Sequence, residues 1–175
     1  MKQKIQIVED AIGNKIVVLQ NIVFKNKQNI DWNAVKKYLQ RYVGEIVTIT
    51  EFEDIIHIGS EFPDEFKGSN YTKHLKGANA KAKANAAQGI IEMLMIATEK
   101  HFSKNHKTKH STTAGNGWYY YTTRFAIPLY QNNAKLDIYN IYSARIIINC
   151  TKFGTMYLYD LIDIKKETST PLKTI

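Results

Sequence analysis

A group of lysines at the start of an alanine-rich segment is the chemical feature that stands out in this chain. Residues 76–88 read KGANAKAKANAAQ, and the alanines predict a helix whose first turns carry Lys81 and Lys83. A helix N-terminus already holds a partial positive charge on its unpaired N–H groups, so acidic side chains normally lie there. Here no acidic residue lies between Lys67 and Gly89. The cluster therefore predicts a bound anion, and a phosphate is the usual group at such a position.

Cleavage of RNA without a metal is one chemistry that these residue types can support. It needs a base for the 2′-hydroxyl, an acid for the leaving oxygen, and cations for the charge that develops on phosphorus. Histidine suits the first two roles because it titrates near neutrality, which makes His110 the candidate general base or acid. Arg124 and Lys83 are the candidate cations, and Arg145, on the neighbouring predicted strand, is a further one.

Other residues are expected to bind nucleic acid without reacting. Alternation along residues 118–129 places Trp118 and Tyr120 on the same strand face as Arg124, where an aromatic ring can stack a base. The predicted nucleic-acid-binding set consists of basic residues and one aromatic residue: Lys76, Lys81, Lys107, Lys109, Tyr120 and Arg145.

The charge of the chain agrees with a polyanionic partner. The formal net charge is +8, and its sign is unevenly distributed along the sequence. Residues 73–110 contain eight lysines against two glutamates, whereas residues 45–65 contain seven acidic residues and no lysine or arginine. Such a division predicts one basic face that binds RNA or another nucleic acid.

Several classes of site are excluded or disfavoured. The single cysteine, Cys150, rules out an internal disulfide or a multi-cysteine zinc site, and its strand pattern places it in the core. His106 and His110 have metal-ligand spacing, but no carboxylate or cysteine lies near them in the sequence, so neither a metal nor a cofactor is expected. No apolar run is long enough to cross a membrane, and the first residues lack an export signal, which predicts a cytoplasmic protein without a membrane partner.

Hydrophobic periodicity predicts the elements that would position these residues. Residues 4–8 and 15–24 form a β-hairpin, residues 32–43 a helix, and residues 46–49 and 55–58 short strands. A long Ala-rich helix follows from Asn79 to Lys100, then a polar loop over residues 101–117. Strands over residues 118–129, 136–149 and 155–165 complete the chain.

These elements predict a single α+β domain in which an antiparallel β-meander packs on the long Ala-rich helix, with an N-terminal β-hairpin and helix added. Residues 1–28 form the hairpin region, residues 29–166 the helix-plus-sheet core, and residues 167–175 a polar tail.

Four sequence words accompany this order of elements: KAKANAAQG at 81–89, GWY at 117–119, TRFA at 123–126 and YLYDLIDIKK at 157–166. Together they resemble a domain of the large polyvalent proteins of phages and conjugative elements, over residues 30–170. Some of those domains are grouped with the barnase, EndoU, colicin and RelE-like ribonucleases. The resemblance implies a mobile-element setting and a ribonuclease-like fold, and because those enzymes share no fixed catalytic set, it transfers no catalytic residue.

Besides a structural accessory domain that binds DNA or RNA nonspecifically, two more specific functions remain open on this basis. The first is a phage or mobile-element protein that binds RNA, with metal-independent ribonuclease activity. The second is a non-catalytic inhibitor of a CRISPR–Cas or other host defence nuclease, in which the acidic residues 45–65 imitate nucleic acid or the basic residues occupy a guide-RNA site.

Overall fold

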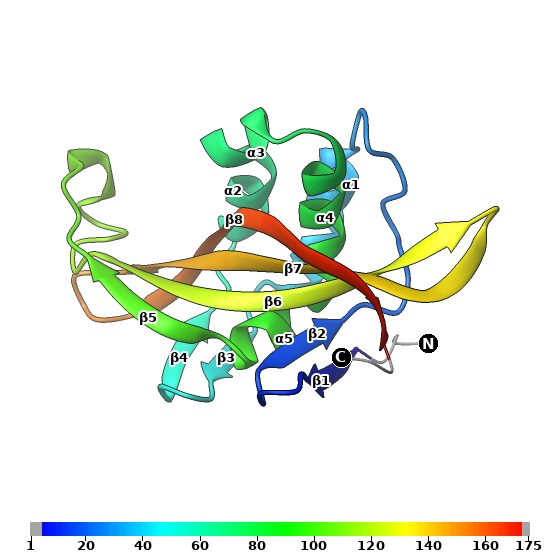
Figure 1. Ribbon diagram of the computed structural model, residues 1–175. Coiled ribbons are helices and arrows are strands. Elements are labelled where there is room, and N and C mark those ends of the chain that lie inside the picture. Colours follow the sequence, from blue (N-terminus) through cyan, green and yellow to red (C-terminus); the bar gives the residue numbers. More distant parts are fainter. Residues whose placement is uncertain (1–4, 173–175) are drawn as a thin grey trace.

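One mixed β-sheet dominates the computed structural model, which describes residues 5–172. Its centre consists of three long strands, β6 (Trp118–Gln131), β7 (Ala134–Cys150) and β8 (Met156–Pro171), and each pairs with the next in antiparallel fashion. Figure 1 shows these strands crossing the whole molecule. The β6–β7 turn lies at one end of the molecule, and the loop that precedes β6 lies at the other.

Shorter strands extend the sheet on both sides. On one side β2 (Lys15–Val18) pairs parallel with β6 and antiparallel with β1 (Gln6–Glu9). On the other side β4 (Asp54–His57) pairs parallel with β8 and antiparallel with β3 (Ile46–Ile49).

The helices are short. Helices α1 (Trp32–Leu39), α2 (Phe62–Gly68), α3 (Asn70–His74) and α4 (Gly77–Ala86) appear above the long strands in Figure 1 and α5 (Ile90–Met95) below them. All five contribute side chains to one core. Three 3-10 turns complete the set: η1 (Gln40–Tyr42), η2 (Ala87–Gly89) and η3 (Thr108–His110). The main core lies between the helices and the strands, and it includes Phe66, Ala84, Tyr121 and Ile146.

The predicted long Ala-rich helix is wrong, because it is three separate pieces: α4, η2 and α5. The break falls at Gly89, whose backbone leaves the helical region at φ −114° and ψ 19°. A Cβ atom at Gly89 would lie 2.9 Å from Leu19 Cδ2 and 3.0 Å from Val17 Cγ1, so the backbone approaches β2 directly. The continuous helix expected from the sequence is therefore interrupted where the backbone passes close to β2.

The predicted architecture, an antiparallel meander packed on that helix, is wrong as well. The sheet is mixed, because β2 and β4 join the long strands in parallel. It also curls like half of a barrel. In addition, Thr98–Ser103, assigned to the end of the long helix and the start of the loop, forms strand β5 and pairs with β6. Residues 167–171, placed in the polar tail, belong to β8 beside β7, and residues 173–175 of that tail lie outside the described residues.

The alternation predicted for β6 is confirmed by its burial. Tyr121, Thr123 and Phe125 are buried, whereas Trp118, Tyr120 and Arg124 remain partly exposed. Period-two patterning sets this division because successive side chains of a strand point to opposite faces.

Candidate nucleic-acid interface

A groove of about 600 Å³ lies where the loop before β6 meets β6, β8 and α3. We call it the basic groove, because its loop side carries two histidines and three lysines: Lys104, His106, Lys107, Lys109 and His110. Its floor and far wall include Ser69, Tyr71, Asp160 and Ile162. The groove brings together five of the residues selected from the sequence, namely Lys107, Lys109, His110, Trp118 and Tyr120.

The loop over residues 104–117 is held by specific backbone contacts. The Asn105 side chain donates to Lys107 O at 3.0 Å and accepts from the Lys107 N–H at 3.1 Å. At the other end of the loop, Asn149 Nδ2 donates to Thr113 O at 2.7 Å. The Asn105 bonds fix a local turn of the loop, and the Asn149 bond attaches the loop to β7.

Three aromatic rings meet at the centre of the basic groove. His110 lies edge-to-face with Trp118 at 5.0 Å and with Tyr159 at 6.0 Å between ring centroids, and the Trp118 and Tyr159 rings are 4.8 Å apart. Nearby, the Arg145 guanidinium lies over the Tyr120 ring at 4.6 Å from its centroid. Flat rings with adjacent cations are the elements from which single-strand-binding surfaces are made.

The surroundings of His110 favour its neutral form. Partial burial lowers the pKa of His110 below its ordinary value of 6.5, and the nearby Lys109 and Lys107 lower it further. Tyr159 beside it shows the opposite shift, since burial and a hydrogen bond to Glu65 raise the pKa of its hydroxyl. At neutral pH the site therefore presents an uncharged imidazole and a phenol, with the positive charge supplied by the lysines.

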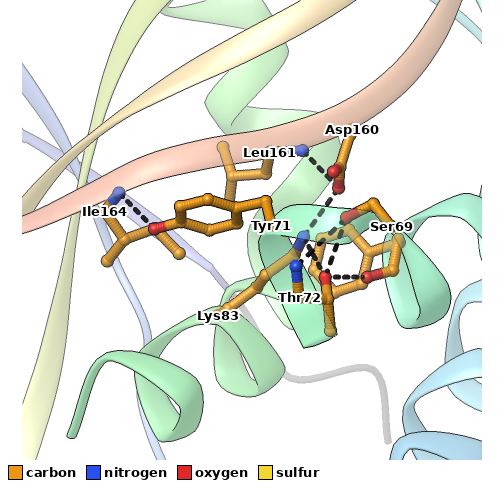
Figure 2. A network of polar contacts seen from close by, with 8 residues as sticks. Ser69, Tyr71, Thr72, Lys83, Asp160, Leu161 and Ile164 are labelled. Atoms are coloured by element: carbon orange, nitrogen blue, oxygen red, sulfur yellow. Dashed lines mark hydrogen bonds and ion pairs between the residues drawn. The ribbon is translucent and has the colours of Figure 1, made fainter. Parts of the chain in front are cut away.

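Lys83, a predicted catalytic cation, is fully buried beneath the basic groove (Figure 2). Its Nζ donates to Asp160 Oδ1 at 2.7 Å and to Thr72 Oγ1 at 2.6 Å. Asp160 also accepts from the N–H of the adjacent Leu161 at 2.8 Å, and its pairing with Lys83 attaches α4 to β8. Burial lowers the pKa of Lys83 and raises that of Asp160, while the attraction between the two charges opposes both shifts.

The anion predicted for the lysine-led helix is therefore a carboxylate of the protein itself. Asp160, which lies 77 residues further along the chain, neutralises Lys83. Lys76 and Lys81 lie outside the residues that line the basic groove. Lys81 borders a separate small pocket with Lys27 and Ile127.

Arg124 is likewise separated from His110. Its guanidinium binds Glu167 through Nε at 2.9 Å and Asp10 through Nη1 at 2.8 Å, and it borders a different pocket from the basic groove. It lies six residues along β6 from Trp118, which corresponds to about 20 Å at the usual rise of a strand. His110, Arg124 and Lys83 thus do not converge on one phosphate, and the structure does not assemble the catalytic set expected from the sequence.

Sequence reasoning missed four residues of this site: Lys104, Glu65, Tyr159 and Asp160. Tyr159 and Asp160 lie in the YLYD word noted at 157–160, so their position at the groove had a signal in the sequence. No sequence signal indicated Glu65, because only the tertiary fold brings α2 close to Tyr159.

Comparison with known proteins gives one kind of relative. No protein-family model and no solved structure matches the chain. Nuclear rim protein 1 of Saccharomyces cerevisiae, in strains YJM789, RM11-1a and S288c, is 27% identical over 156 residues. The alignment covers 87% of this chain and 29% of the yeast protein, so the chain spans less than a third of the length of these curated relatives.

This comparison corrects two expectations from the sequence. The phage, mobile-element and anti-defence setting is wrong, because the relatives found are yeast proteins named for the nuclear rim. The cytoplasmic location is wrong for the same reason. Within residues 5–172, no helix has the length and apolar character needed to cross a bilayer.

Proposed function

We propose that this chain binds a single-stranded nucleic acid in the basic groove. The observation that carries the proposal is the gathering of Lys104, Lys107 and Lys109 along the same groove as the Trp118 and Tyr159 rings. The lysines would neutralise successive phosphates, and the rings would stack unpaired bases, which a duplex does not offer. RNA and single-stranded DNA both present this chemistry.

Binding rather than cleavage is the activity that the geometry supports. Metal-independent cleavage requires a base, an acid and a cation around one phosphate. The groove offers His110, whereas Lys83 is neutralised by Asp160 and Arg124 by Asp10 and Glu167. We therefore assign no reaction to the groove.

An inhibitory protein–protein role has no comparable support. The acidic residues 45–65 do not form one free surface, because Asp54 pairs with Lys100 and Asp64 pairs with Lys36. Pairing within the fold removes part of the negative charge that imitation of a nucleic acid would require.

Replacing Lys104, Lys107 and Lys109 together by alanine tests the proposal. The probes are fluorescently labelled uridine RNA and thymidine DNA tracts of about 12 nucleotides, within the site sizes known for such grooves. The wild type should bind at least one probe, with log affinity falling against log salt at a slope of about −2 if three phosphates are contacted. The triple variant should bind about 10–100-fold more weakly at low salt and lose most of that slope.

The matched control changes the same number of charges elsewhere. Lys15, Lys25 and Lys165 are exposed and lie outside the groove lining, so their replacement by alanine should weaken binding far less. Equal losses in the two triple variants would show that only the net charge matters, and the groove proposal would then fail.

The yeast relatives suggest where this binding takes place. Because they are named for the nuclear rim, we infer that the chain acts at the nuclear periphery. Fluorescence imaging of the tagged chain in yeast should show a rim around the nucleus. A uniform cytoplasmic signal would contradict this inference without affecting the binding proposal.

A further inference from the structure

A second pocket, of about 460 Å³, opens beside the basic groove. The two share Glu65, Lys109, His110 and Tyr159 as a common border. Its size falls within the range of about 300–1,000 Å³ that small-molecule pockets occupy. A nucleotide whose phosphates lie in the groove therefore has an adjoining space for its base.

The walls of this second pocket suit a flat ring. The Tyr157 ring lies directly against the backbone of Gly59, where an added Cβ would be only 3.2 Å from Tyr157 Cδ1. Phe62 also borders the pocket but is almost completely buried, so the partly exposed Tyr157 supplies the ring face. Aromatic faces of this kind stack nucleobases of any sequence, so the walls alone give no selectivity.

Two carboxylates, Glu61 and Glu65, give the pocket a polar edge, and we call it the carboxylate pocket. Glu65 lies near the Tyr159 hydroxyl and raises its pKa. The Glu61 carboxylate makes no hydrogen bond and no ion pair within residues 5–172, so it is free to accept. Asn149, the amide of the pocket, uses its Nδ2 donor on Thr113 O.

An ionised carboxylate only accepts hydrogen bonds, and it accepts two in parallel. On the Watson–Crick edge, guanine presents two adjacent donors, N1–H and the N2 amine. Adenine and cytosine present one donor beside an acceptor, and uracil presents one donor between two acceptors. A free carboxylate in a pocket with an aromatic wall therefore matches guanine better than any other standard base.

We propose that the carboxylate pocket receives one guanine of the bound strand and that Glu61 reads its N1–H and N2 amine. The proposal rests on the proposed function, since the groove must hold the strand beside the pocket. Among the charged residues, Lys104 and Lys107 line only the groove and Glu61 lines only the pocket, while Glu65 and Lys109 lie on the border that the two share.

Four uridine tracts test the proposal, one unmodified and three with a central guanosine, inosine or adenosine. Inosine keeps the N1–H of guanosine but lacks the N2 amine. The wild type should bind the guanosine tract about tenfold or more tighter than the adenosine tract, with inosine between them. Glu61→Gln replaces one acceptor with a donor, so it should abolish the preference for guanosine while retaining affinity for the plain uridine tract.

Glu51→Gln is the matched control. Glu51 is an exposed acidic residue outside both linings, so the same change of charge there should leave the guanosine preference intact. If the wild type binds all four tracts equally, the guanine pocket is refuted while the groove proposal stands. If the wild type binds no tract at all, both proposals fail.

Discussion

Lys83 illustrates how the environment of a single residue decides its role. Its position in a lysine-rich helix start suggests a free cation, yet the side chain is fully buried and ion-paired to Asp160. The ammonium group also lies 4.6 Å from the centre of the Phe66 ring. A buried charge that loses its partner is strongly unfavourable, so this pair makes the contact between α4 and β8 specific.

Lys83→Met should destabilise the protein by about 3–5 kcal/mol, because it leaves the Asp160 carboxylate buried without its counter-ion. Burial raises the pKa of Asp160 and Lys83 opposes that shift, so without Lys83 the folded variant retains a proton that the unfolded chain has released. The free energy of unfolding of the variant should therefore fall as pH rises above the ordinary value of 3.8 and through the raised pKa. Urea unfolding at several pH values measures both effects.

Lys81→Met is the control for this substitution. Lys81 lies two residues earlier on the same helix, is partly exposed, and forms no ion pair among residues 5–172. Its loss should change stability by less than about 1 kcal/mol. Equal stability of the Lys83→Met variant and the wild type would contradict the buried ion pair.

At the scale of elements, the segment α4–η2–α5 attaches distant parts of the chain to one another. Asn85 accepts from the N–H groups of Val23 and Phe24 and donates to the Phe24 carbonyl at 2.8 Å, so it fixes the irregular chain after β2. Gly89 then lets the backbone turn against β2. The conspicuous KAKANAAQG word thus encodes contacts within the fold through Lys83, Asn85 and Gly89.

Gly89→Ala should destabilise the protein by about 1–3 kcal/mol, because the new methyl group would overlap Leu19 and Val17, which are both fully buried. Thermal or urea unfolding gives the value. Gly68→Ala, at the end of α2, is the control, since no heavy atom lies within 4 Å of the added Cβ. If the Gly89→Ala variant is as stable as the Gly68→Ala variant, the side chains of Leu19 and Val17 can shift to accommodate the added methyl group.

At the scale of the whole molecule, Arg124 connects parts of the sheet that are not neighbours. From β6 it binds Asp10, which follows β1, and Glu167, which lies on β8. Asp10 in turn accepts from the N–H groups of Ile12 and Asn14, so it forms the β1–β2 turn. Arg124 therefore attaches the N-terminal hairpin to the curled sheet, far from the basic groove.

Arg124→Gln should speed amide hydrogen exchange in β1 and β2 and cost about 1–2 kcal/mol, a value reduced by the partial exposure of the ion pairs. Nucleic-acid affinity should not change. Arg145→Gln should show the reverse, with weaker nucleic-acid binding and unaltered exchange, since Arg145 stacks on Tyr120 at the groove. If the Arg124 variant loses nucleic-acid binding while amide hydrogen exchange in β1 and β2 stays normal, Arg124 belongs to the nucleic-acid-binding site.

By itself, the sequence determined the local patterns: the buried and exposed faces of β6, the turn at Asn132 and Asn133, and the basic loop that holds Lys107, Lys109 and His110. These follow from side-chain period and from turn chemistry, which depend on neighbouring residues alone. The tertiary structure decided which charges stay free. Asp160 neutralises Lys83, Asp10 and Glu167 neutralise Arg124, and α2 brings Glu61 and Glu65 beside the groove. The partners in these ion pairs are separated by tens of residues or more, and no local pattern specifies which distant carboxylate a lysine or arginine will meet.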